Sequence, residues 1–154
     1  TVLEDVNAPD KTYFFLSPLF LFSLLLLCAV LLFIQELRRK KYTAWLDVVM
    51  HTFQGGAGLL VAFLFFLSEH PAVDSNWLVV MFNPIPLFYA AWLLYCYKKG
   101  RKNLLSYVNL AVTAGFMITM VLCLQSFNPA MWVLMSSFLV RALSQAHFTY
   151  HKGR

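Results

Sequence analysis

The sequence predicts an all-α integral membrane protein, a helical bundle with five transmembrane helices, from its composition, its hydrophobic blocks and its charge placement. Of 154 residues, 60% are hydrophobic and 12% are charged, about half the charged fraction of a soluble domain. The apolar residues form blocks of about 20, the length with which an α-helix crosses the hydrocarbon core. Basic clusters follow the first, third and fifth blocks, so they all lie on one side of the membrane, as the positive-inside rule requires.

Five apolar blocks define the spans of one transmembrane domain, residues 13–154. We place the helices at about Tyr13–Ile34, Trp45–Leu67, Trp77–Tyr97, Leu104–Leu124 and Ala130–Tyr150. Tryptophan and tyrosine are enriched at membrane–water boundaries, and here they lie near the ends of the blocks. Residues 1–12 precede the first block and are expected to form a linker.

The basic residues predict the orientation of the bundle. Ten of the twelve follow the first, third or fifth span: Arg38, Arg39, Lys40, Lys41, Lys98, Lys99, Arg101, Lys102, Lys152 and Arg154. The other side carries mainly carboxylates. Because basic loops stay in the cytoplasm, the amino end lies outside and the carboxyl end inside. The net charge of +5 is then a topology signal that contacts membrane lipids, and we expect no nucleic-acid partner.

The acidic amino end must be carried across the membrane, and we expect a larger exported domain upstream of Thr1 to do this. Residues 1–12 would then be a periplasmic linker into the first helix.

Arg141 is the most unusual residue within the spans. It lies about 16 Å into the fifth helix at 1.5 Å per residue, close to the midplane, where a charge should face protein or water. Gln54 has a similar predicted depth, and its neighbours Gly55 and Gly56 permit close helix approach. We therefore expect Arg141 to pack against Gln54–Gly56. The functional interpretation is a site for an anionic lipid or substrate; the structural one, which we favour, is a packing contact.

A second polar group is predicted near the inner boundary. Asp47 and His51 are four residues apart and share one helix face, and His147 lies at a similar depth, with Gln145 nearby. We expect structural pairing among them. The four histidines lie on opposite sides or at unmatched spacing, so we expect no metal site and no cofactor.

The third block is interrupted by Asn83-Pro84, followed by Pro86. Asparagine can cap a helix whose first turn takes the proline, and Asn128-Pro129 repeats this pattern before the fifth span. Either the third helix begins at Trp77 and is kinked, or it begins at Pro84. Both alternatives place irregular backbone at shallow depth, which is tolerated only against protein or a water-filled cavity.

Glu69, His70 and Pro71 border this interruption on the outer side. A histidine beside a carboxylate suits general acid–base chemistry, although adjacent residues rarely share the necessary geometry. The alternatives are a docking surface beneath an outer domain and a simple loop, in which Pro71 ends the second helix.

The run Ser68-Glu69-His70-Pro71, followed by Asn76-Trp77 and Asn83-Pro84, resembles the membrane portion of bacterial proteins, common in the Bacteroidota, with an Lnb-type periplasmic domain. The resemblance covers roughly residues 17–102. It implies a link to lipoprotein N-acylation, in which an acyl chain moves from the diacylglyceryl group of a lipoprotein to the amino group of its N-terminal cysteine. The catalytic residues would belong to the periplasmic domain.

With this resemblance, we interpret the chain as a bacterial inner-membrane domain that anchors a periplasmic catalytic domain and presents the lipid substrate to it. Candidate lipid- or substrate-binding residues are Glu69, His70, Asn76, Asn83 and Arg141; structural motif positions are Pro71, Pro84, Pro86, Gln54, Gly55 and Gly56. Partners would be membrane lipids, lipoprotein substrates and the upstream domain. Two alternatives remain open: a plain anchor or assembly subunit, and a small anion carrier or channel that uses Arg141.

Overall fold

The computed structural model describes residues 14–67, 81–122 and 127–151, and these ranges contain five α-helices and no strand. A short 3-10 turn, η1 (Phe14–Leu16), leads into the first helix. The helices are α1 (Pro18–Arg39), α2 (Trp45–Leu67), α4 (Ile85–Lys98), α5 (Leu105–Leu122) and α6 (Pro129–His151). The all-helical architecture predicted from the sequence is confirmed for this part of the chain.

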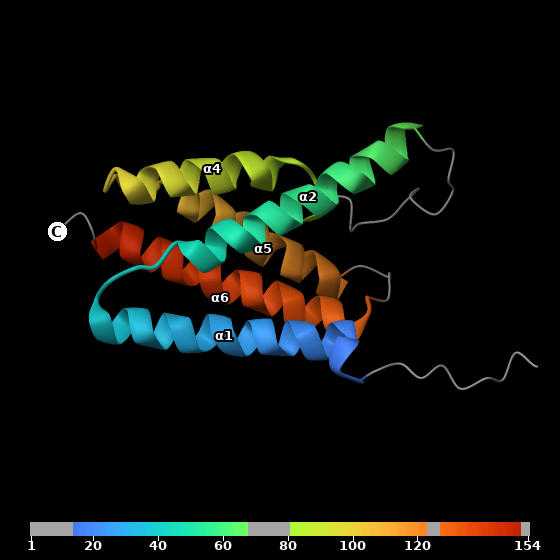
Figure 1. Ribbon diagram of the computed structural model, residues 1–154, viewed down its shortest axis with the longest axis horizontal. Helices are drawn as coiled ribbons and strands as arrows, with labels where there is room; N and C mark the ends of the chain where they lie inside the picture. Colours follow the sequence, from blue (N-terminus) through green and yellow to red (C-terminus); the bar gives the residue numbers. More distant parts are fainter. Residues whose placement is uncertain (1–13, 68–80, 123–126, 152–154) are drawn as a thin grey trace, which may run out of the picture.

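The helices form a bundle, and their ends gather at two opposite sides of it (Figure 1). The end of α1, the start of α2, the end of α4, the start of α5 and the end of α6 gather on one side. The connections there carry Lys40, Lys41, Lys99, Arg101 and Lys102. We call this side the basic end, and the other side the opposite end.

α6 occupies the centre of the bundle. It packs against α1 and α5, while α2 packs against α4. A cluster of buried methionine, leucine and phenylalanine side chains joins the two groups, with Met50 and Met81 on one side and residues of α5 and α6, such as Phe138, on the other. The central position of α6 explains why it tolerates polar residues, since protein rather than lipid surrounds them.

Three described helices are long and apolar enough to cross a membrane: α1, the Trp45–Leu64 part of α2, and α5. α1 is both the most hydropathic of the three and the least buried, as expected of a helix that faces lipid. α4 has only 14 residues, about 21 Å of helix. The structure therefore supports a membrane protein, with α4 too short to cross the hydrocarbon core by itself.

One predicted helix start is corrected, and the interruption predicted in the third span is observed. The first helix begins at Pro18 rather than Tyr13, because the Ser17 hydroxyl caps it and proline suits the first turn. The predicted start of the third span, Trp77, lies outside the described residues. Within them Met81 is helical, residues 82–84 form bends and α4 begins at Ile85, where the Asn83 side chain accepts a hydrogen bond from the Ile85 N–H at 2.9 Å. The expected interruption at Asn83-Pro84 is therefore present.

The connection between α1 and α2 is fixed by a left-handed residue. Lys40 has φ = 51° and closes α1, with its N–H directed to the Glu36 and Leu37 carbonyls. This conformation turns the chain sharply, and brings Tyr42 and Thr43 back over the end of α1.

Candidate functional site

Three charged side chains from three helices meet at the corner between α1 and α2: Glu36, Asp47 and Arg141. All are at most 1% exposed. The Arg141 guanidinium donates to both oxygens of Glu36 at 2.8 and 3.0 Å, and to both oxygens of Asp47 at 2.7 and 2.8 Å. Two such forked contacts are the strongest geometry for an arginine with carboxylates. We call these three residues the ionic cluster.

The ionic cluster has one cation for two carboxylates, and neutral donors satisfy the remaining acceptor positions. The Ser144 hydroxyl donates to Glu36 at 2.6 Å, and the Thr43 N–H donates to the same carboxylate at 2.8 Å. The Tyr42 hydroxyl donates to Asp47. Arg141 also donates to the Thr43 carbonyl at 3.2 Å. Buried charges are tolerated only when such a network satisfies them.

The prediction that Arg141 packs against the Gln54–Gly56 surface is wrong. That prediction assumed that each helix ends at the same membrane level. In the structure α6 runs to His151, ten residues beyond Arg141, whereas α1 ends three residues after Glu36. Arg141 therefore lies level with the last turn of α1 and the first turn of α2, not with Gln54. Its guanidinium is committed to the ionic cluster, which favours the structural interpretation of Arg141.

Gln54 instead satisfies the backbone where the chain becomes irregular. Its Nε2 donates to the Met81 carbonyl at 3.0 Å, and its Oε1 lies 3.0 Å from His51 Nδ1. Residues 82–84 interrupt the helical hydrogen bonding, and a free carbonyl within the membrane is costly unless a neighbouring side chain pairs with it. We call residues 82–84 the helix break.

The glycines on α2 permit contact with the helix break and α4, not with α6. A Cβ atom added at Gly58 would lie 2.3 Å from the Asn83 backbone, and one at Gly55 would lie 2.6 Å from the Leu87 nitrogen. One at Gly56 would meet nothing within 4 Å. The expected close helix approach is present, with α4 as the partner. Pro84 and Pro86 lie at the start of α4, where proline is tolerated.

The predicted group of Asp47, His51, His147 and Gln145 is divided in the structure. Asp47 belongs to the ionic cluster, and His51 pairs with Gln54. Gln145 is buried in a separate network, where it accepts from Tyr89. His147 is exposed on α6. Glu69, His70, Pro71 and Asn76 lie outside the described residues.

Glu36 was not identified from the sequence as a functional or structural candidate. It stands in "QELRRKK", where its charge reads as part of a solvated basic segment. One signal was present: Glu36 is an acidic residue placed between an apolar helix and a basic cluster, and a buried arginine requires a carboxylate partner. Depth along each helix, taken alone, does not point to Glu36.

The environment of Tyr42 on the α1–α2 connection changes its titration. Burial raises its pKa well above the ordinary value of 10.0, and the adjacent Asp47 carboxylate raises it further, while Arg141 acts in the opposite direction. The hydroxyl therefore remains a donor to Asp47 throughout the physiological pH range.

Residues 10–153 match a family model described as the Lnb transmembrane domain and named for five transmembrane helices. The match extends beyond the region of the motif resemblance and includes α5 and α6. No curated protein and no solved structure matches the chain significantly. Because the family model covers nearly the whole chain, this protein belongs to the family of Lnb transmembrane domains.

Proposed function

We propose that this domain, besides anchoring in the membrane, presents a lipid-anchored protein substrate to an exported catalytic domain of the lipoprotein N-acyltransferase type. Membership of the Lnb transmembrane family supports the anchoring role. The apolar surface of the helices supports it too, with large side chains such as Leu60, Phe88 and Leu122 more than two-thirds exposed. Presentation of the substrate is the further step.

The helix break is the main observation that supports this proposal. α4 provides about 21 Å of helix, so the hydrocarbon core of about 30 Å continues past its start. The irregular backbone of residues 82–84 would then lie within that remaining layer. Irregular backbone at membrane depth is tolerated where it is buried in protein or lines a water-filled cavity, and interrupted helices form the substrate sites of many transporters.

The side chains at the start of α4 suit an amphiphilic ligand. Ile85 and Phe88 are 70% and 75% exposed on this helix, and acyl chains would lie against them. The Asn83 amide and the backbone of the helix break would provide polar groups near the outer boundary of the hydrocarbon core. The positive-inside rule directs the basic end to the cytoplasm, so the helix break would face the exported side.

The reaction implied by the family would occur outside this chain. The cysteine amine would attack an ester of the diacylglyceryl group; an amide would form as the ester bond breaks, and the proton lost by the amine would leave a free hydroxyl on the glyceryl group that remains attached to the cysteine. Held beside the catalytic domain, the substrate reacts as if intramolecularly, and such proximity contributes several kcal/mol to catalysis. This domain would supply position rather than catalytic groups.

The competing function is a plain anchor, which the ionic cluster favours because its hydrogen bonds serve the fold. The anion-carrier alternative receives no support from Arg141, whose donors contact Glu36, Asp47 and Thr43.

The test is an exchange in cells, in the complete protein, with the lipidation state of a reporter lipoprotein measured by mass spectrometry. Replacement of the domain by an unrelated five-helix bundle of the same orientation should abolish N-acylation at equal abundance. Retained acylation would show a plain anchor.

Two matched substitutions localise the effect. Asn83→Ala and Asn128→Ala each remove a side-chain oxygen that accepts a backbone N–H at a helix start, both at 2.9 Å. We expect Asn83→Ala to lower acylation about tenfold or more through lost positioning, and Asn128→Ala to leave it near wild type. Equal acylation in the two variants would contradict a role for the helix break.

A further inference from the structure

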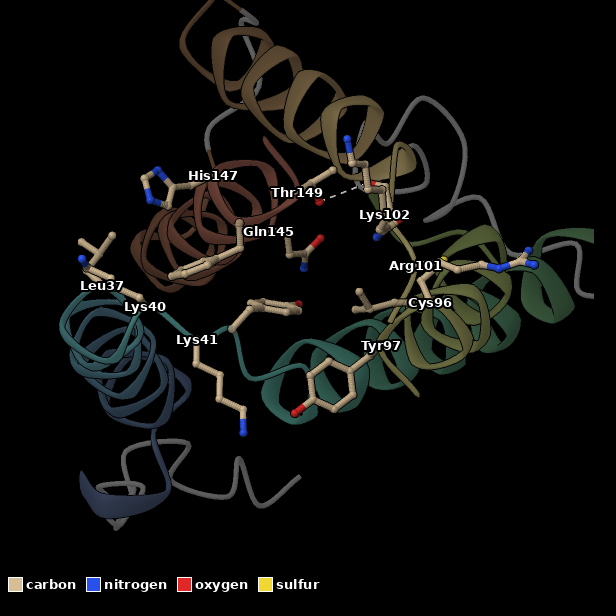
Figure 2. A pocket seen from close by; sticks show the side chains of 14 residues that line it. Leu37, Lys40, Lys41, Cys96, Tyr97, Arg101, Lys102, Gln145, His147 and Thr149 are labelled. Carbon is tan, nitrogen blue, oxygen red and sulfur yellow. Dashed lines mark hydrogen bonds between the residues drawn. The ribbon is translucent and has the colours of Figure 1, made fainter. Parts of the chain in front are cut away.

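A cavity of about 720 Å³ opens at the basic end, away from the helix break. Figure 2 shows it between the end of α1, the α1–α2 connection, α4 and α6. Its walls include the apolar side chains Leu37, Leu93 and Phe148 and the rings of Tyr42 and Tyr97. The volume is in the range of small-molecule sites, and larger than a single phosphate group requires.

The floor of this cavity contains a buried hydrogen-bond donor without an acceptor. Gln145 is 2% exposed, and its Nε2 has no hydrogen-bond partner. Its amide projects from α6 into the middle of the cavity (Figure 2). Buried donors in native proteins almost always have partners, so this N–H group indicates a missing acceptor.

A chain of hydrogen bonds fixes which side of the Gln145 amide faces the cavity. The indole N–H of Trp92 can only donate, and it donates to Asn103 Oδ1 at 3.2 Å. Asn103 Nδ2 must then donate to the Tyr89 hydroxyl, 3.1 Å away. The Tyr89 proton is thereby directed to Gln145 Oε1 at 2.5 Å. The Nε2 donor is left for the cavity.

Four basic residues line the cavity: Lys40 and Lys41 from the α1–α2 connection, and Arg101 and Lys102 from the α4–α5 connection. The Arg101 guanidinium stacks on the Tyr95 ring at 5.7 Å and points away from the cavity (Figure 2). No carboxylate is among the residues that line the cavity. The cavity therefore combines positive charge with a buried N–H donor.

We infer that the basic-end cavity binds a phosphate-bearing ligand, whose oxygens accept from Gln145 Nε2 and pair with the lysines at its edge. Basic pockets between transmembrane helices commonly bind anionic headgroups, and phosphate oxygens supply strong acceptors. Two sources share this chemistry: the headgroup of an anionic phospholipid, whose acyl chains would follow the apolar wall, and a soluble phosphate. The site lies at the end opposite to the helix break, so it is independent of the proposed substrate presentation.

The test uses the full chain, purified in a neutral detergent. The probes are phosphatidylglycerol, zwitterionic phosphatidylcholine and inorganic phosphate; lipid binding is measured by native mass spectrometry and phosphate binding by calorimetry. We expect saturable binding of phosphatidylglycerol or of phosphate, and weaker binding of phosphatidylcholine. Binding of phosphatidylglycerol alone identifies the headgroup, and binding of phosphate alone identifies the soluble source. No preference over phosphatidylcholine, with no phosphate binding, would overturn the inference.

A matched pair of double variants separates the cavity from general surface charge. Lys41→Gln with Lys102→Gln removes two cations that line the cavity, whereas Lys98→Gln with Lys99→Gln removes two cations at the same end that do not. At about fivefold per lysine near a membrane surface, the first pair should weaken binding about 25-fold. An equal loss in both pairs would show nonspecific attraction and refute the site.

Gln145→Glu tests the buried donor itself. The substitution keeps an oxygen for Tyr89 and replaces the free N–H₂ with a second oxygen, which repels phosphate. We expect binding to be lost while the circular dichroism spectrum stays that of the wild type. Unchanged binding in a folded Gln145→Glu protein would contradict the assignment; if this variant does not fold, the lysine pairs decide.

Discussion

Replacing Arg141 with methionine should strongly destabilise the bundle. Methionine fills much of the same volume but leaves Glu36 and Asp47 buried side by side without their cation. The substitution removes four guanidinium–carboxylate hydrogen bonds of 2.7–3.0 Å. Breaking a buried ion pair by removing one partner costs about 3–5 kcal/mol, and here two carboxylates lose the same partner.

We therefore expect a loss near the upper end of that range, about 4–5 kcal/mol. This is a factor of about 1,000 or more in the folding equilibrium, and a large part of the total stability of about 5–15 kcal/mol that is typical of a domain. The measurement is unfolding of the purified chain in mixed micelles with increasing SDS, followed by circular dichroism.

Neutralising the whole ionic cluster provides the control. The triple variant Glu36→Gln, Asp47→Asn, Arg141→Met removes all three charges, and replacing a complete buried ionic network is often close to neutral. It should recover most of the stability lost by Arg141→Met alone. A cost below about 1 kcal/mol for the single variant, the value typical of a solvated pair, would refute the description of a buried, mutually dependent cluster.

A double-mutant cycle distinguishes the observed partner from the one predicted by depth. Residues in contact show coupling of about 0.5–3 kcal/mol, whereas distant ones add independently. Arg141→Met should couple strongly with Asp47→Asn and not with Gln54→Met. Strong coupling to Gln54 would favour the original sequence prediction over the observed geometry.

Three further predictions concern the helix break, the α1–α2 connection and the start of α6. Gly58→Ala should destabilise the bundle, because the added Cβ would lie 2.3 Å from the backbone of the helix break. Gly56→Ala, whose Cβ would meet nothing within 4 Å, should stabilise the bundle by about 0.5–1 kcal/mol through helix propensity. Thermal unfolding of both variants tests this pair, and equal shifts of the unfolding temperature would contradict it. The raised pKa of Tyr42 means that the folded state holds the phenolic proton more tightly than the unfolded state does. The contribution of Tyr42 to stability is therefore complete below about pH 10 and is lost as the pH rises further. In SDS titrations the stability difference between wild type and Tyr42→Phe should shrink above that pH, and a difference that grows would contradict the raised pKa. Asn128→Ala should cost about 1 kcal/mol, because it removes an acceptor from the first turn of α6, and an unchanged unfolding midpoint would show that water replaces the cap.

Local patterns in the sequence were sufficient for the helices and for several of their ends. Apolar blocks located the helical segments, because each segment must be long and hydrophobic enough to face lipid. The Asn-Pro pairs at Asn83 and Asn128 marked helix starts, and both side chains accept the expected N–H. The family could also be identified from short motifs, and the family model confirms it over residues 10–153.

The sequence by itself determined that this is a helical membrane domain with basic connections at one end, because hydrophobicity and helix capping are properties of neighbouring residues. Only the tertiary structure decided which side chains meet. Arg141 pairs with Glu36 and Asp47 because α6 extends far beyond the ends of α1 and α2, and Gln54 meets the Met81 carbonyl because α4 starts late. Contacts between helices depend on how far each is rotated and shifted along its axis, and a residue's position within one helix does not contain that information.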